Sequence, residues 1–127
     1  MEPAHDIALA LQQAGLGTLG VDIFKGPVRP ANGIPVDSIF VLATGGRAGQ
    51  RIHSDRSEIR YPTAQIRVRA ESFAEGYEKA SAVYDALFDL RYPGYMDFLL
   101  LQSEPIYLGQ DANGNYEWSL NVECSYS

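Results

Sequence analysis

The chain has 127 residues, of which 46% are hydrophobic and 11% aromatic. This composition excludes a largely disordered protein, and the length predicts a single compact domain over residues 1–127. The net charge of −6 at pH 7 disfavours a protein that wraps nucleic acid non-specifically, because such binding needs an excess of lysine and arginine against the phosphates.

The cysteine content and the first residues predict the cellular setting. One cysteine, Cys124, excludes a disulfide or a cysteine-based zinc site within one chain. The first six residues carry no positive charge of the kind that begins a secretory signal, and no apolar run approaches the ~20 residues of a membrane-spanning helix. We therefore expect a soluble protein made in a reducing cytoplasm.

The N-terminal part predicts a helix followed by strands. Ile7, Leu11 and Ala14 recur at helical spacing and predict a helix over residues 6–14, which Gly15 ends. A brief strand is predicted at 21–24, followed by a proline-rich loop over 26–35. Residues 37–44 are almost continuously apolar and predict a central strand covered on both faces.

The middle of the chain predicts a half-buried strand and a long helix. Residues 63–70 alternate, which places Arg67 and Arg69 on the polar face of a strand. Ser72 and Glu75 stand at the spacing of a capping box, in which each side chain satisfies the other residue's backbone N–H. An apolar stripe then predicts the packing face of a helix that runs to about Leu90: Phe73, Tyr77, Ala80, Tyr84, Leu87 and Phe88.

The C-terminal part predicts further strands. Two strand pieces are expected at 98–102 and 106–108, and Asn113-Gly114 is a strong signal for a hairpin turn. Residues 116–126 alternate and predict a long strand with one apolar face. The order of elements predicts an α+β fold: a mainly antiparallel sheet with two helices packed on one face and a long arginine-rich β-hairpin loop.

Two glycine-rich segments bear a partial likeness to nucleotide-binding motifs. Gly15, Gly17 and Gly20 have the spacing of a dinucleotide motif, but that motif follows a strand and opens a helix, whereas here a helix precedes it. We interpret these glycines as a helix-to-strand turn. Residues 45–49 lack the lysine and hydroxyl of a phosphate loop, and we interpret them as a hairpin tip.

Other candidate sites are also incomplete. Residues 111–115 resemble the start of a calcium loop, but Gly114 is at the fourth rather than the sixth position and the terminal glutamate is missing. We interpret them as a solvated β-turn. His5 and His53 have no acid or nucleophile at a spacing that would indicate a catalytic triad or a metal site. We therefore predict no catalytic residue, metal site or cofactor.

The segment 45–62 is long for a hairpin connection, and long loops are often functional. It carries Arg47, Arg51, Arg56 and Arg60. Three interpretations remain open: a solvated mobile loop, contact with an acidic neighbouring subunit, or contact with DNA that passes through a channel. The many acidic residues elsewhere in the chain favour the neighbouring subunit.

Three stretches in order resemble the tail terminator, tail-completion and minor capsid proteins of long-tailed bacteriophages. They are residues 20–26 leading into the proline-rich loop, residues 61–69 leading into the long helix, and residues 108–111 ahead of Asn113-Gly114 and the last strand. The resemblance covers most of the chain. It implies a small structural subunit of the virion that forms a hexameric ring, caps the completed tail tube and offers the surface to which the head connector docks.

The charge pattern agrees with such a ring, because a closed ring needs two different complementary surfaces on each subunit. We hypothesise that an acidic helix face pairs with basic residues of a neighbouring copy. The candidate interface or channel residues are Arg47, Arg51, Arg56, Arg60, Arg67, Arg69, Glu75, Glu78, Asp85 and Asp89. Two alternatives remain: another neck component, such as a head-completion or connector protein, or a small enzyme or ligand-binding domain with a pocket near the glycine-rich segments.

Overall fold

The computed structural model describes residues 2–26, 36–51 and 58–127. Within these ranges, two helices and eight strands follow one another. In order they are α1 (Pro3–Gln13), β1 (Ile23–Lys25), β2 (Ser38–Ala43), β3 (Arg47–Arg51), β4 (Glu58–Tyr61), β5 (Thr63–Ala70), α2 (Phe73–Phe88), β6 (Asp97–Leu100), β7 (Ile106–Gln110) and β8 (Tyr116–Ser125).

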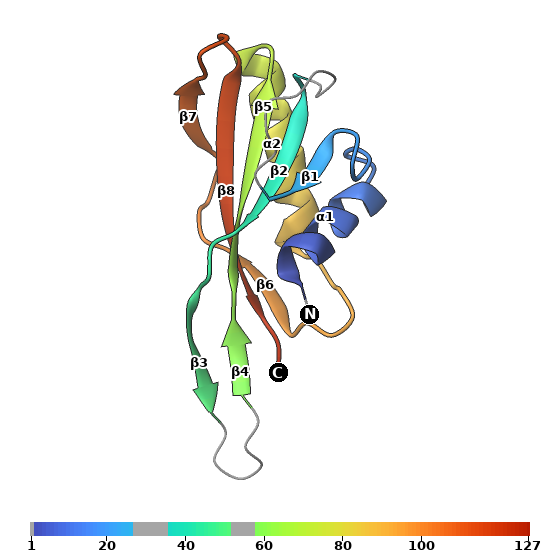
Figure 1. The fold of residues 1–127 in the computed structure, drawn as a ribbon, viewed down its shortest axis with the longest axis vertical. Helices are drawn as coiled ribbons and strands as arrows, with labels where there is room; N and C mark the ends of the chain where they lie inside the picture. Colours follow the sequence, from blue (N-terminus) through green and yellow to red (C-terminus); the bar gives the residue numbers. More distant parts are fainter. Residues whose placement is uncertain (1, 27–35, 52–57) are drawn as a thin grey trace.

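The strands form one main sheet and one smaller ribbon. The main sheet has the order β1-β2-β5-β8-β6. The strand β7 also pairs with β8, along a different part of it from β6. Only the β1–β2 pairing is parallel among the described strands of this sheet. The strands β3 and β4 form a separate antiparallel ribbon that extends away from the helices (Figure 1). This architecture confirms the predicted α+β fold.

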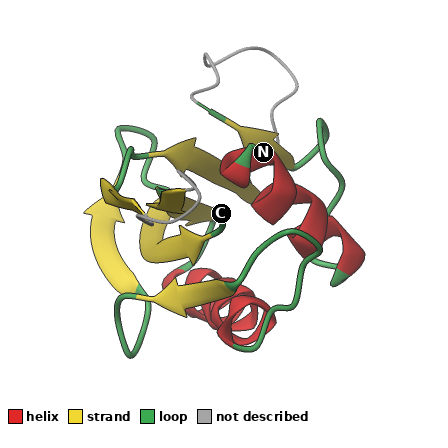
Figure 2. Ribbon diagram, turned by 90° about the horizontal axis from the view of Figure 1, so that it is seen from below, coloured by secondary structure: helices red, strands yellow, loops and turns green. Residues whose placement is uncertain are grey.

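The hydrophobic core lies between the two helices and one face of the sheet (Figure 2). The register of the central strands aligns buried side chains in rows, such as Ile39, Val68 and Trp118. Along both β5 and β8, every second side chain faces the helices. The alternation seen in both segments of the sequence therefore predicted the core face correctly.

The helix α1 begins earlier than expected, at Pro3. Proline is favoured at the first helical position because its fixed φ suits the helix and its missing N–H costs no hydrogen bond there. Gly15, with a φ of +82°, follows the helix as predicted. Asp6 lies in the first turn, where its carboxylate accepts a hydrogen bond from the Tyr95 hydroxyl. This bond ties the loop after α2 to the first helix.

The packing face of α2 differs from the predicted stripe. Half of the predicted capping box is present, since the Ser72 hydroxyl accepts a hydrogen bond from the Glu75 backbone N–H at 3.2 Å, whereas no bond from the Ser72 N–H to the Glu75 side chain occurs in the described residues. Its buried residues, however, are Gly76, Ala80, Val83 and Leu87. Of the predicted stripe, only two residues are buried, and Phe88 is 68% exposed.

The Trp118 indole explains why the buried face of α2 differs from the predicted stripe. A Cβ atom on Gly76 would lie 2.7 Å from Trp118 Nε1, so the indole occupies the space that a side chain would need. Phe73 and Tyr77 then flank the indole edge-on, with ring centroids 5.0 and 5.4 Å from it. The aromatic side chains that seemed to mark the packing face therefore border it.

Two predictions about the strands need correction or refinement. Helices cover only one face of β2, and Phe40 and Leu42 on the other face are half-buried, so the expected cover on both faces is wrong. The strands β6 and β7 both occur, but each pairs with a different part of β8. The turn before β8 is confirmed: Asp111 N–H donates to the Asn115 carbonyl, and Gly114 N–H donates to the Asp111 carbonyl.

None of the helices in the described residues is long and apolar enough to cross a membrane.

The close approach of Gly76 and Trp118 predicts that Gly76→Ala destabilises the protein. Alanine favours a helix over glycine by up to about 1 kcal/mol, but overpacking a rigid core costs ~1–3 kcal/mol. We expect a net loss of about 1 kcal/mol in the free energy of unfolding, measured by denaturant titration. Glu78→Ala on the exposed side of α2 is the control and should change stability by less than about 0.5 kcal/mol. A higher denaturation midpoint for Gly76→Ala would contradict the packing argument.

The buried Cys124 thiol predicts a loss of stability in alkali. Burial, with the charges of Asp6 and Glu123, raises the pKa of this thiol from 9.0 to about 12. Above about pH 9 the unfolded chain loses this proton and the folded chain keeps it, so the free energy of unfolding falls as pH rises through that range. Denaturant titrations across this range should show a smaller fall for Cys124→Ala. Rapid labelling of the native thiol at about pH 8 would contradict its protonated, inaccessible state.

Candidate subunit interface

The four predicted acidic residues of α2 form one exposed strip, here called the acidic stripe: Glu75, Glu78, Asp85 and Asp89. Their spacing keeps them on one side of the helix over about 21 Å, at 1.5 Å per residue. Asp89 lies 3.8 Å from Arg91, but both side chains are more than 80% exposed, so this ion pair adds little stability. No ion pair joins the other three to another residue in the described part of the chain. The stripe is therefore available to a partner.

Arg67 and Arg69 lie on the face of the sheet that no helix covers, here called the open face. Arg67 stands between Phe40 and Ser119 in the pairing register. Its Nε is buried and has no hydrogen-bond partner among the described residues. Arg69 Nε donates to the Val36 carbonyl at 3.0 Å, and its guanidinium lies 5.7 Å from the Phe40 ring centroid. Both arginines are half-buried, which limits their conformational freedom.

The acidic stripe and the open face belong to opposite layers of the subunit. The structure therefore does not bring the two predicted charge sets together within one chain. Their distance from each other is compatible with pairing between neighbouring copies, as hypothesised from the sequence.

Within the predicted loop at 45–62, the described residues 45–51 and 58–62 largely form the strands β3 and β4 and are here called the arm. Its two strands pair antiparallel, with Arg47 opposite Tyr61 and Arg51 opposite Glu58, and it continues from β2 and β5. The expectation of a hairpin tip at Gly45-Gly46 is wrong, because these residues join β2 to β3. Gly46 has a φ of +107°, and a Cβ atom there would lie 2.1 Å from the Tyr61 carbonyl oxygen. Only glycine allows the strands to approach so closely at this bend.

Arg47 fastens the arm to the main sheet. Its Nε donates to Glu123 Oε1 at 2.8 Å, and its guanidinium lies 3.6 Å from the centroid of the Tyr61 ring. The Glu123 side chain is only 17% exposed, which strengthens this bond relative to a fully solvated pair. The roles of Tyr61 and Glu123 were not predicted from the sequence, because the Arg47–Glu123 hydrogen bond joins residues 76 positions apart and leaves no local signal.

The other arginines of the arm differ in their contacts. Arg60 Nε lies 3.5 Å from Glu58 Oε1, and the hydrogen bond and charge of Tyr126, followed by those of Glu58, raise the pKa of Arg60. Arg51 is exposed and makes no ion pair with any described residue. Arg56 and His53 lie outside the described residues. Arg51 is therefore the arm cation most available to a partner.

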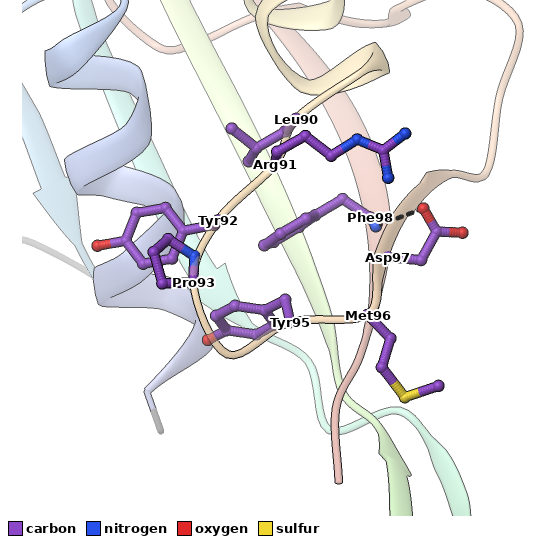
Figure 3. A pocket seen from close by; sticks show the side chains of 8 residues that line it. All are labelled: Leu90, Arg91, Tyr92, Pro93, Tyr95, Met96, Asp97 and Phe98. Carbon is purple, nitrogen blue, oxygen red and sulfur yellow. Dashed lines mark hydrogen bonds between the residues drawn. The ribbon is translucent and has the colours of Figure 1, made fainter.

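A hollow of about 370 Å³ lies beside the loop after α2 (Figure 3). The rings of Tyr92, Tyr95 and Phe98 line it together with Leu90, Arg91, Pro93, Met96 and Asp97. Burial, and then the hydrogen bond to Asp6, raise the pKa of Tyr95, so its hydroxyl stays protonated at neutral pH. Three of the eight lining residues are aromatic, and the lining does not bring a nucleophile and a base together.

The glycine-rich segments and the C-terminal turn have structural roles. Residues 15–20 connect α1 to β1, as interpreted from the sequence. A smaller hollow of about 180 Å³ lies at the base of the arm and includes Gly45 and Gly49. Partial burial opposes ionisation of Asp111, but hydrogen bonds from Asn115 and Asn113 lower its pKa overall, since its carboxylate accepts both backbone N–H groups. No group of three or more potential metal-binding side chains gathers in the described ranges.

The contacts of Arg47 predict that Arg47→Ala loosens the arm without unfolding the domain. Loss of the Glu123 bond and the Tyr61 contact should speed amide hydrogen exchange in β3 and β4, while exchange in β5 and β8 stays as in the wild type. Arg51→Ala is the matched control and should leave exchange in the arm unchanged. Equal exchange in both variants would show that Arg47 does not fasten the arm.

Comparison with known proteins adds one finding to this geometry. No match was found among curated protein sequences. The family model described as "Bacteriophage tail terminator protein" matches residues 10–127, which include all the described strands, α2 and the last four residues of α1. This match agrees with the resemblance seen in the sequence and supports a structural role in the phage tail. The chain therefore belongs to the bacteriophage tail terminator family.

Proposed function

We propose that the protein forms a ring at the head-proximal end of the tail tube, ends tail polymerisation there and provides the surface that joins the head. The observation that supports this proposal best is the separation of charge between the two layers of the subunit. The acidic stripe lies on the helix layer, whereas Arg67 and Arg69 lie on the open face. A head-to-tail ring needs two such different and complementary surfaces on every subunit.

The proposed partners follow from this position. They are further copies of the same chain, as a hexamer, together with the tail tube protein and the head connector. DNA passes through the channel without specific contacts, because a net charge of −6 gives little attraction to phosphate. The subunit acts by binding alone, without catalysis. It is a component of the virion.

Removal of the protein from assembling phage tests this function. Without it, we expect tails of irregular length that stay unattached to filled heads, seen by electron microscopy. Purified protein added to these tails should bind one end as a ring and restore joining to heads. If the protein bound isolated portal complexes and not tail tubes, it would be a head-side connector, and the proposal would fail.

The charge surfaces predict how substitutions affect the ring. Glu78→Gln with Asp85→Asn removes two charges of the acidic stripe from solvent-exposed positions, so folding should persist. We expect fewer rings on tail ends and a lower joining yield, with a stronger effect at low salt. Ala112→Lys with Asn113→Lys is the control, since it changes the net charge equally at an exposed turn. Equal ring formation by both variants would remove the acidic stripe from the interface.

A further inference from the structure

The outer edge of β6 and β7, here called the β6–β7 edge, is open and apolar. Each of these strands pairs with β8 on one side and with no other described strand on the other side. Four aliphatic side chains there are exposed by 40–52%: Leu99, Leu101, Ile106 and Leu108. An open edge with exposed aliphatic side chains is a template for pairing with another strand. This edge therefore has the properties of a binding surface.

The arm has a second open edge. Within the described residues, β3 pairs only with β4, and all five of its residues are exposed. Such a two-stranded ribbon has little stability of its own in water. Arg47 holds the ribbon in place through Glu123, which leaves the outer side of β3 free for pairing. The arm thus presents an ordered strand away from the body of its own subunit (Figure 1).

These two open edges lie on opposite sides of the sheet. The strand β3 continues from β2, and β4 from β5; β4 is linked to Tyr126 at the end of β8, which in turn pairs with β6. The order across the molecule is therefore β3, β4, the end of β8 and then β6. Because two strands separate them, β3 and β6 cannot pair within one chain. They are free to pair between copies that stand side by side.

Charge complementarity identifies the occupant as a second copy of this chain. After Arg91 the sequence contains no lysine or arginine, and its charged residues are Asp97, Glu104, Asp111, Glu117 and Glu123. Asp97 and Glu104 are exposed along the β6–β7 edge. The arm has the opposite character, since its described strands carry three arginines against Glu58. The length of β3 also fits, because five residues span about 17 Å, close to the span of β6 or β7.

We propose that β3 of one copy adds to the β6–β7 edge of the next copy by β-strand pairing, with Arg51 facing the acidic groups of that edge. Backbone hydrogen bonds supply the binding, and the aliphatic side chains become covered. The contact joins two different surfaces, so it repeats head to tail. This inference rests on the proposed ring and adds a second contact between its subunits, besides the proposed pairing of the acidic stripe with the open face.

Cysteine cross-linking tests the contact. The double variants Gln50→Cys/Leu99→Cys and Gln50→Cys/Ile106→Cys place one thiol on β3 and one on β6 or β7, all at exposed positions. Disulfides form only between residues whose Cα atoms lie within about 7 Å, so only direct neighbours react. Oxidation of rings bound to tails should yield a ladder of covalent multimers from at least one variant. The control Gln50→Cys/Glu78→Cys should give no ladder, because Glu78 lies on α2.

The charge contact gives an independent measurement. Arg51→Glu should lower the cross-linking yield of the reactive double variant several-fold, and Glu104→Arg in the same chain should restore it. If both the Leu99→Cys and the Ile106→Cys double variants formed complete rings and gave no ladder, this inference would be wrong and the proposed ring would stand. A ladder from the Gln50→Cys/Glu78→Cys control would instead show that the arm contacts the acidic stripe of the neighbouring copy. If the protein formed no rings and did not terminate tails, the proposed function itself would be wrong.

Discussion

The apolar side chains of β5 and β8 point to the one face of the sheet that both helices cover, and this single-sided burial governs the rest of the structure. The β5–β8 pairing aligns Ile66 with Leu120 and Val68 with Trp118. Because side chains alternate along a strand, the intervening residues must face the other side. Arg67 and Arg69 are therefore held on the open face by the same alternation that builds the core. The core thus fixes where the charged surfaces lie.

The sequence predicted those features that depend on periodicity and local capping. The alternation in β5 and β8, the Ser72 cap and the turn at Asn113-Gly114 all occur where they were expected. The packing face of α2 was misjudged, because aromatic residues such as Phe73 and Tyr77 border the core as readily as they fill it. What decides between these two roles is the Trp118 indole against Gly76, a contact between residues 42 positions apart. No pattern within the helix reports such a contact.

The arm illustrates the same limit for the candidate interface. Arginine content drew attention to the segment, but its glycines and charged residues give little strand propensity. It forms strands because β2 and β5 already lie in register, so their continuation beyond Gly46 needs only one bend. The acidic residues of α2 were placed correctly because exposed positions on a helix follow from its period. The exposed aliphatic side chains of β6 and β7 were missed, since a run of leucines reads as core.

Open strand edges can pair with a wrong partner as well as the right one, and the distribution of charge bears on that choice. If two copies met through the same β6–β7 edge, the acidic residues Asp97 and Glu104 would face like charges and oppose the contact. If two arms met, their arginines would do the same. Of the possible pairings between these two open edges, only arm against edge brings opposite charges together, and that contact is head to tail. The separation of arginines from acidic residues along the chain therefore favours head-to-tail contacts over symmetric pairs, although both use the same backbone hydrogen bonds.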